Sequence, residues 1–180
     1  GQYLQLPAAL SRAEEMLAEG ADIIDIGGES TFIDRDEVSE SEEIKRTIPV
    51  IQTIKKAHPG TIISIDTSKA AVAKAAIEAG ATMVNDVTAG RGDKAMFSLL
   101  AQYPQVRLVL MYAKDATSRT TTDRVDYDDI VQTIINFLEK RIAWAKAAGV
   151  NREQIIIDPG LGFFISAIAD YSLEIIARLG

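Results

Sequence analysis

Apolar residues follow two different spacings along this chain, and the two spacings alternate. Short runs rich in Val, Ile and Leu predict strands, whereas longer segments with an apolar residue every three or four positions predict helices. The predicted strands cover 22–27, 61–66, 82–86, 107–112 and 154–158, and the predicted helices cover 7–19, 41–57, 69–79, 93–103, 127–148 and 171–179. Such alternation is typical of β–α units built around a parallel sheet.

Polar residues interrupt the predicted strands, end them or follow shortly after them. Buried parallel strands are usually continuous apolar sequence, so a polar residue in this position needs a reason to be there. In a (β/α) barrel the carboxyl ends of the strands form one rim, and this rim carries the chemistry. The residues concerned are Asp25, Glu29, Asp66, Asn85, Asp86, Lys114 and Asp158.

Two fold classes agree with this pattern of elements. One is the (β/α)8 TIM barrel, which has eight strands where five are predicted here. The other is an open doubly wound sheet, which is complete with five strands and binds its ligand where the strand order reverses. Gly27-Gly28-Glu29 leads into an acidic loop and lacks the glycine-rich phosphate fingerprint of that second class. We therefore favour the barrel, as a single domain over residues 1–180.

Composition and charge narrow the class of protein further. A chain of 180 residues with 47% hydrophobic content can bury one substantial core. The net charge of -7 disfavours a nucleic acid or an anionic membrane as the main partner. The absence of cysteine leaves no disulfide framework, and we expect a cytoplasmic protein. The first 20 residues are amphipathic and charged, which predicts neither a targeting nor a membrane segment.

Four segments, taken in order, resemble the dihydropteroate synthase family. They are GADIIDIGGEST at 20–31, ISIDTSKAAVAKAAIEAGA at 63–81, NDV at 85–87 and IIIDPGLGF at 155–163. The resemblance extends from about Gln5 to Leu179 and implies a (β/α)8 barrel of which this chain holds strands two to six, incomplete at both ends. It also implies a transferase that condenses a 6-hydroxymethyl-dihydropterin diphosphate with 4-aminobenzoate to give dihydropteroate in folate biosynthesis.

The resemblance assigns a pterin pocket to the strand ends. Asp66, Asn85 and Asp158 match the positions that bind the pterin, whose edge of donors and acceptors suits carboxylates and an amide. Asp66 and Asp158 are the expected catalytic residues, because fixed negative charge favours the cation character that develops when pyrophosphate leaves. The positions that wall or adjoin the pterin are Val87, Met111 and Phe163.

The second half of the expected site is less well matched. Thr31 and Arg35 are the candidates for the loop that meets 4-aminobenzoate. Phe32, Tyr112 and Phe164 stand where the family has arginine, histidine and the start of Gly-Lys-Thr. Mg²⁺ is implied as the cofactor of the pyrophosphate, with no metal-ligating residue assigned in this chain. The expected partners are the pterin and aminobenzoate substrates and a second copy of the chain in a homodimer.

Other interpretations of the same residues stay open. A pterin-dependent methyltransferase and a non-catalytic protein that binds a pterin or folate are the alternative functions. A cap on the following helix is the structural alternative for Asp66, and strand-ending turns are the alternatives for Asp158 and for Asn85-Asp86. The basic residues of the longest loop meet either solvent or an anionic substrate group, and they are Lys114, Arg119 and Arg124.

Overall fold

A computed structural model describes residues 6–32 and 37–179, and within them a parallel sheet whose strands follow the order of the chain. The strands are β1 (Ile23–Gly27), β2 (Ile62–Asp66), β3 (Met83–Asp86), β4 (Arg107–Met111) and β5 (Ile155–Asp158). Each pairs in parallel with the next. A doubly wound sheet would reverse its order, and the described strands have no reversal. The expected barrel class is therefore confirmed, and the doubly wound alternative is wrong.

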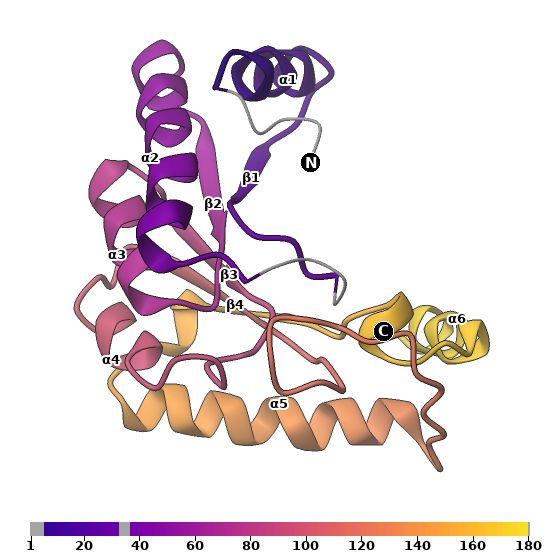
Figure 1. Cartoon of the computed structure of the whole chain (residues 1–180). Helices are drawn as coiled ribbons and strands as arrows, with labels where there is room; N and C mark the ends of the chain where they lie inside the picture. Colours follow the sequence, from indigo (N-terminus) through magenta and orange to yellow (C-terminus); the bar gives the residue numbers. More distant parts are fainter. Residues whose placement is uncertain (1–5, 33–36, 180) are drawn as a thin grey trace.

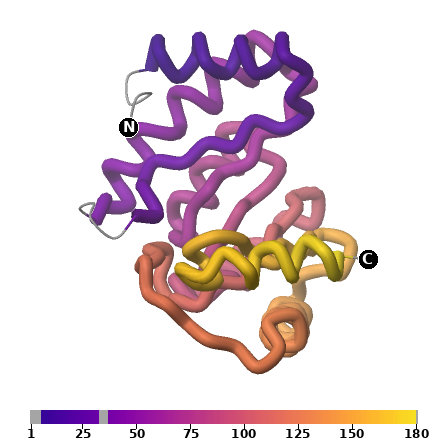
Figure 2. The backbone as a smooth tube through the Cα atoms, turned by 90° about the vertical axis from the view of Figure 1, so that its right-hand side faces the viewer, coloured from indigo at the N-terminus to yellow at the C-terminus, as the bar shows by residue number. Residues whose placement is uncertain are grey.

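The described helices are α1 (Leu6–Ala18), α2 (Glu40–Ala57), α3 (Ala70–Ala79), α4 (Met96–Leu100), α5 (Ile130–Ala147) and α6 (Ala169–Ala177), with short 3₁₀ turns at Arg152–Gln154 and Gly162–Phe164. Helices α2 to α5 each connect two consecutive strands and run along one side of the sheet, whereas α1 precedes β1 and α6 follows β5 (Figure 1). Figure 2 shows the chain passing in order from α1 at the top of the view to α5 at the bottom. This stepwise path follows from right-handed β–α–β crossovers between neighbouring strands.

Two helices are shorter than the sequence predicts, and side-chain caps explain both differences. The helix predicted over 93–103 is reduced to α4, because Asp93 is used elsewhere: its Oδ2 accepts a hydrogen bond from the N–H of Ala70 at 2.9 Å and so caps α3. The helix predicted from residue 127 begins at Ile130. Asp129 precedes it as the N-cap, and its side chain accepts from the N–H of Gln132 at 2.9 Å.

The core lies between the sheet and its helices. Alternate strand residues point to this side, and they are almost without solvent contact. The exposure of these side chains is 0–4%, and they are Ile24, Ile63, Ile65, Val84, Leu108 and Leu110. The remaining strand positions point to the opposite face, which we call the inner face. The predicted site residues of the strands are divided between these two faces.

Candidate active site

The inner face carries a polar row at the carboxyl ends of β2 and β3. Asp66 is paired in register with Asn85, and Gly27 of β1 is paired with Asp66. Because the flanking residues Ile65 and Val84 point into the core, Asp66 and Asn85 point together to the inner face. The sequence motifs thus bring together an acid and an amide across neighbouring strands.

Burial and negative charge make Asp66 an unusual carboxyl group. Burial is the largest cause, followed by the negative charges of Asp25, Asp86 and Glu43, and together they raise its pKa from 3.8 to about 7. Burial also raises the pKa of Asp25, against hydrogen bonds from Ser64 and Asn85 that act to lower it. Perturbed carboxyl groups of this kind are concentrated at functional sites. Asp66 does not cap α3, since that role belongs to Asp93.

Asn85 has a buried acceptor that the fold leaves unused. Its side-chain amide hydrogen bonds to Asp25, but Oδ1 is buried and has no hydrogen-bond partner within residues 6–32 and 37–179. An unpaired buried carbonyl costs about 1–3 kcal/mol, and native proteins rarely keep one without a reason. A ligand donor placed between Asp66 and Asn85 would satisfy this oxygen.

Asp86, although adjacent to Asn85, belongs to the scaffold. It points to the helix side and is fully buried. Its carboxylate accepts from the hydroxyl of Thr88 at 2.6 Å and from the N–H of Gly90 at 2.7 Å, so turn chemistry is confirmed for this residue. Arg141 lies on the carbonyl of Ala89 in the same turn, at 2.6 Å from its Nε. This turn holds the end of β3 and thereby fixes the direction of Asn85.

Asp158 ends β5 beside Met111, with which it is paired in register. Its Oδ1 accepts from the N–H of Gly160 at 2.8 Å, which is a strand-ending turn. Gly160 has a φ of +68°, and a Cβ there would lie 2.3 Å from the carbonyl oxygen of Tyr112. The Asp-Pro-Gly sequence therefore locks the β5 end against β4, and it places the Asp158 carboxyl group on the inner face.

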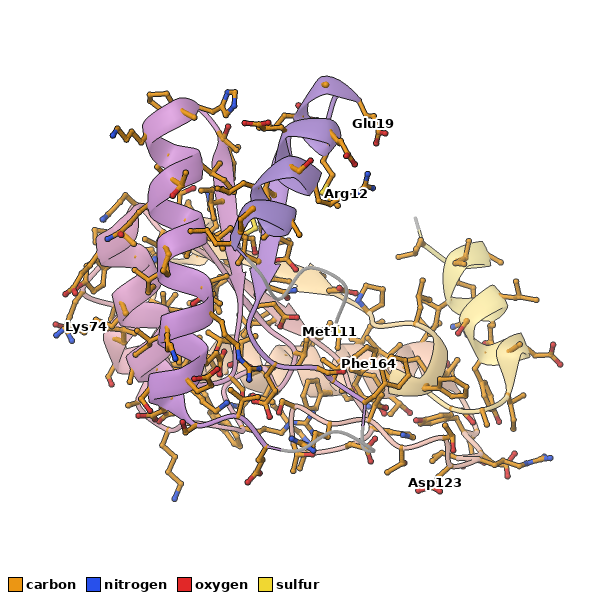
Figure 3. The ribbon with its side chains drawn as sticks, turned by 45° about the horizontal axis from the view of Figure 1, so that its top comes forward. Arg12, Glu19, Lys74, Met111, Asp123 and Phe164 are labelled. Carbon is orange, nitrogen blue, oxygen red and sulfur yellow. The ribbon has the colours of Figure 1, made fainter. Side chains whose placement is uncertain are left out.

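A small apolar cluster adjoins the polar row. Val87, Met111 and Ala113 are buried, and the aromatic ring of Phe164 packs against them. The side chains of Met111 and Phe164 are labelled beside one another in Figure 3. Phe163, the sequence candidate for this wall, is 43% exposed. The cluster therefore contains Phe164, which sequence reasoning noted only as a departure from the family pattern.

Thr31, one of the two second-substrate candidates, is held by a neighbouring loop. The carbonyl of Thr31 accepts from the N–H of Thr120 at 2.9 Å, and Phe32 forms an isolated parallel bridge with Thr120. Phe32 is 59% exposed. Arg35 lies outside the described residues. Tyr112 is buried at 6% exposure and packs edge-on against Phe137 at 5.2 Å between ring centroids, so it belongs to the helix side.

Four charged residues near the loop after β1 form a network of ion pairs that the sequence did not predict. We call Glu29, Glu43, Lys69 and Arg119 the Glu29 network. Lys69 Nζ contacts Glu29 and Glu43 at 2.5 and 2.7 Å, and Arg119 contacts Glu29 at 2.9 Å. Burial acts to raise the pKa of Glu29, but the hydrogen bonds from Lys69 and Arg119 hold it below its usual value. The partners come from α2, the start of α3 and the β4–α5 connection, so spacing gave no signal for them.

The basic residues of the longest loop are also paired within the protein. Lys114 contacts Asp115 at 2.5 Å and the carbonyl of Thr121 at 2.9 Å, with a side chain that is 6% exposed. Arg124 pairs with Asp126 at the surface. Together with the pairing of Arg119, these contacts give each of the three residues a protein partner.

A parallel β–α arc with an acidic, partly unsatisfied row at its carboxyl rim defines the class of (β/α)-barrel enzymes that bind a small polar ligand there. A family model described as pterin binding enzyme matches residues 1–180. The chain belongs to this pterin-binding enzyme family, which confirms the resemblance found in the sequence.

Named relatives make the similarity more specific. A dihydropteroate synthase of Clostridium beijerinckii is 43% identical over 163 residues, which are 91% of this chain and 57% of that protein. A solved structure of the Yersinia pestis dihydropteroate synthase with a sulfonamide drug complex has a TM-score of 0.90 and 32% identity, and the match covers 99% of this chain and 63% of that one. The Xanthomonas albilineans enzyme with 4-aminobenzoic acid has a TM-score of 0.86, 36% identity and coverages of 97% and 59%. This chain thus spans about three fifths of the length of these relatives.

The described residues contain no group of three or more His, Cys, Asp or Glu side chains placed to hold a metal ion. Mg²⁺ depends on substrate phosphates and waters more than on protein ligands, so an implied Mg²⁺ would be held mainly by the diphosphate. Among the helices that the structure describes, none is both long and apolar enough to cross a membrane.

Proposed function

We propose that the protein condenses a 6-hydroxymethyl-dihydropterin diphosphate with 4-aminobenzoate, forming dihydropteroate as a transferase of folate biosynthesis. The observation that carries the proposal is the unpaired Oδ1 of Asn85 beside Asp66. Its support from relatives is that the similar proteins and structures described above are named dihydropteroate synthase. A cytoplasmic homodimer that uses Mg²⁺ with the diphosphate is part of the same proposal and rests on the family resemblance.

The pterin is bound by matching its edge to the polar row. The ring presents N–H donors next to acceptors, and the Asp66 carboxylate can accept two of these donors. The buried Oδ1 of Asn85 accepts a further donor and so gains the partner it lacks. Asp158 closes the row from β5. The apolar ring faces are covered by the cluster that adjoins the row, which contains Val87, Met111 and Phe164.

The reaction exchanges one bond at the pterin methylene carbon. The carbon–oxygen bond to diphosphate breaks, the carbon–nitrogen bond to the aminobenzoate amine forms, and the amine gives up a proton. Positive charge develops on the carbon and spreads into the ring as diphosphate departs. Asp66 and Asp158 provide fixed negative charge on the ring, which stabilises this transition state more than the ground state. The loop residues Thr31 and Arg35 are assigned to the approach of the second substrate.

Turnover of labelled 4-aminobenzoate tests the function directly. With both substrates and magnesium present, labelled dihydropteroate should form, and omission of the pterin diphosphate is the control. An Asn85→Leu variant, which keeps the branched shape but removes the acceptor, should weaken pterin binding about 10-fold or more. Absence of product from a folded protein that binds the pterin would reject the synthase and favour a binding protein.

A further inference from the structure

Thr120 joins two loops that belong to opposite ends of the described sheet. It lies in the β4 loop, residues 112–129, and is 6% exposed. Its N–H donates to the carbonyl of Thr31 at 2.9 Å in the β1 loop, of which residues 28–32 and 37–39 are described. Its hydroxyl donates to the carbonyl of Phe163 at 2.8 Å in the β5 turn, residues 159–168. One buried residue therefore links the loops after β1 and β5, through its backbone N–H on one side and its hydroxyl on the other.

Neighbouring contacts make the β4 loop a firm support for this link. Arg119 pairs with Glu29 at 2.9 Å and fixes the β1 loop a second time. The N–H of Lys114 donates to the carbonyl of Phe164 at 2.8 Å and fixes the β5 turn a second time. The Lys114 side chain pairs with Asp115 inside the loop. The loop thus keeps its own shape while it holds both neighbours.

The linked loops border the polar row. A small cavity between the β1 loop and the β4 loop is lined by Glu29, Ser30 and Thr31, by Asp66 and Val87 on the strand side, and by Ser118 of the β4 loop. Phe164, which the same contacts hold, packs on Met111 at the apolar wall. Val87 belongs both to this cavity and to the apolar cluster, so the β1 loop and the β5 turn flank the same end of the polar row.

We propose that Thr120 is a positioning residue that orients the second substrate by fixing the separation of the β1 loop and the β5 turn. The proposal rests on the proposed function, because the second substrate is the acceptor of that condensation. Asp66 and Asn85 are held by the sheet ladder and not by Thr120. Loss of the Thr120 hydroxyl should therefore affect the acceptor far more than the pterin.

Three variants separate this role from simple loop packing. Thr120→Val keeps the shape and the backbone N–H but removes the donor to Phe163, Thr120→Ser keeps the donor, and Thr122→Val changes an exposed threonine of the same loop. For Thr120→Val, KM for 4-aminobenzoate should rise about 10-fold or more, while Kd for the pterin diphosphate stays within about 3-fold. Thr120→Ser and Thr122→Val should both remain within about 3-fold of the wild type in both quantities.

Hydrogen exchange supplies a readout that does not need turnover. In Thr120→Val the amide of Lys114, which is bonded to Phe164, should exchange about 10-fold faster than in Thr120→Ser. If the wild type makes no product, the proposed function fails and this exchange difference alone decides whether Thr120 links the loops. Equal exchange in the two variants, or equal loss of pterin and aminobenzoate affinity in Thr120→Val, would overturn the positioning role.

Discussion

The polar row on the strands and the Glu29 network at the loops both contain carboxyl groups, but the pKa shifts of these groups are opposite in direction. In the row, Asp66 has a raised pKa and Asn85 keeps an unpaired buried oxygen. In the network, Glu29 has a lowered pKa because Lys69 and Arg119 already satisfy it. Unsatisfied polar groups await a ligand, whereas satisfied ones hold the fold. The comparison assigns binding to the strands and support to the ion pairs.

The largest expected effect is on the strand side. Asp66→Ala should weaken pterin binding at least about 100-fold, or about 3 kcal/mol, because it removes a desolvated charged acceptor. Titration calorimetry of the wild type and the variant with a pterin diphosphate measures the loss.

Asp22→Ala is the matched control for this variant. Asp22 is an exposed acid just before β1, at the end of the strand away from the polar row. Its replacement should leave pterin affinity unchanged. Unchanged affinity in Asp66→Ala would instead contradict the division of roles, since the perturbed carboxyl group would then have no part in binding.

A change in the Glu29 network should lower the stability of the fold more than it lowers pterin affinity. Lys69→Met leaves the carboxylate of Glu43, which is 1% exposed, without its cation. The free energy of unfolding should fall by about 2 to 3 kcal/mol, measured by urea denaturation. Lys74→Met is the control, because Lys74 is exposed on α3 and its pair with Glu78 spans 3.9 Å (Figure 3). If Lys69→Met abolished pterin binding without loss of stability, the network would belong to the site.

The strand side was the part that the sequence could predict. The period of two in a strand, together with the parallel alignment of strand ends, is enough to bring Asp66 and Asn85 together from local sequence. The same rule separates Asn85 from Asp86, which the motif presents as a pair. Helix ends were less predictable, because Asp93 caps α3 from a position 23 residues away from Ala70.

The loop side could not be predicted, because its contacts are distant in sequence. Glu29 is 40 residues from Lys69 and 90 residues from Arg119. No periodicity relates residues at such separations, and ion pairs between loops depend on how the finished barrel segment aligns them. For a similar reason the sequence did not predict that Phe164, and not Phe163, packs against the apolar cluster. A 3₁₀ turn over Gly162–Phe164 decides which of the two rings faces the cluster.

The pH dependence of stability tests the raised pKa of Asp66 without any ligand, and its slope of about 1 kcal/mol per pH unit is the smallest of the expected effects. The pKa is about 7 in the folded protein and near 3.8 when unfolded, so between these values the folded state keeps a proton that the unfolded chain has released. Rising pH therefore lowers the contribution of Asp66 to stability throughout this window, and the loss is nearly complete by about pH 8, one unit above the folded pKa.

An Asp66→Asn variant has no titratable group at this position, so the unfolding free energy of the wild type minus that of the variant isolates the contribution of the carboxyl group. The difference should fall by about 1 kcal/mol between about pH 5 and pH 6 and become constant above about pH 8. Urea denaturation at several pH values measures it, and Asp22→Asn should give a flat difference. A flat difference for Asp66→Asn would mean that its carboxyl group is as satisfied as that of Glu29, and the contrast between the strands and the loops would be lost.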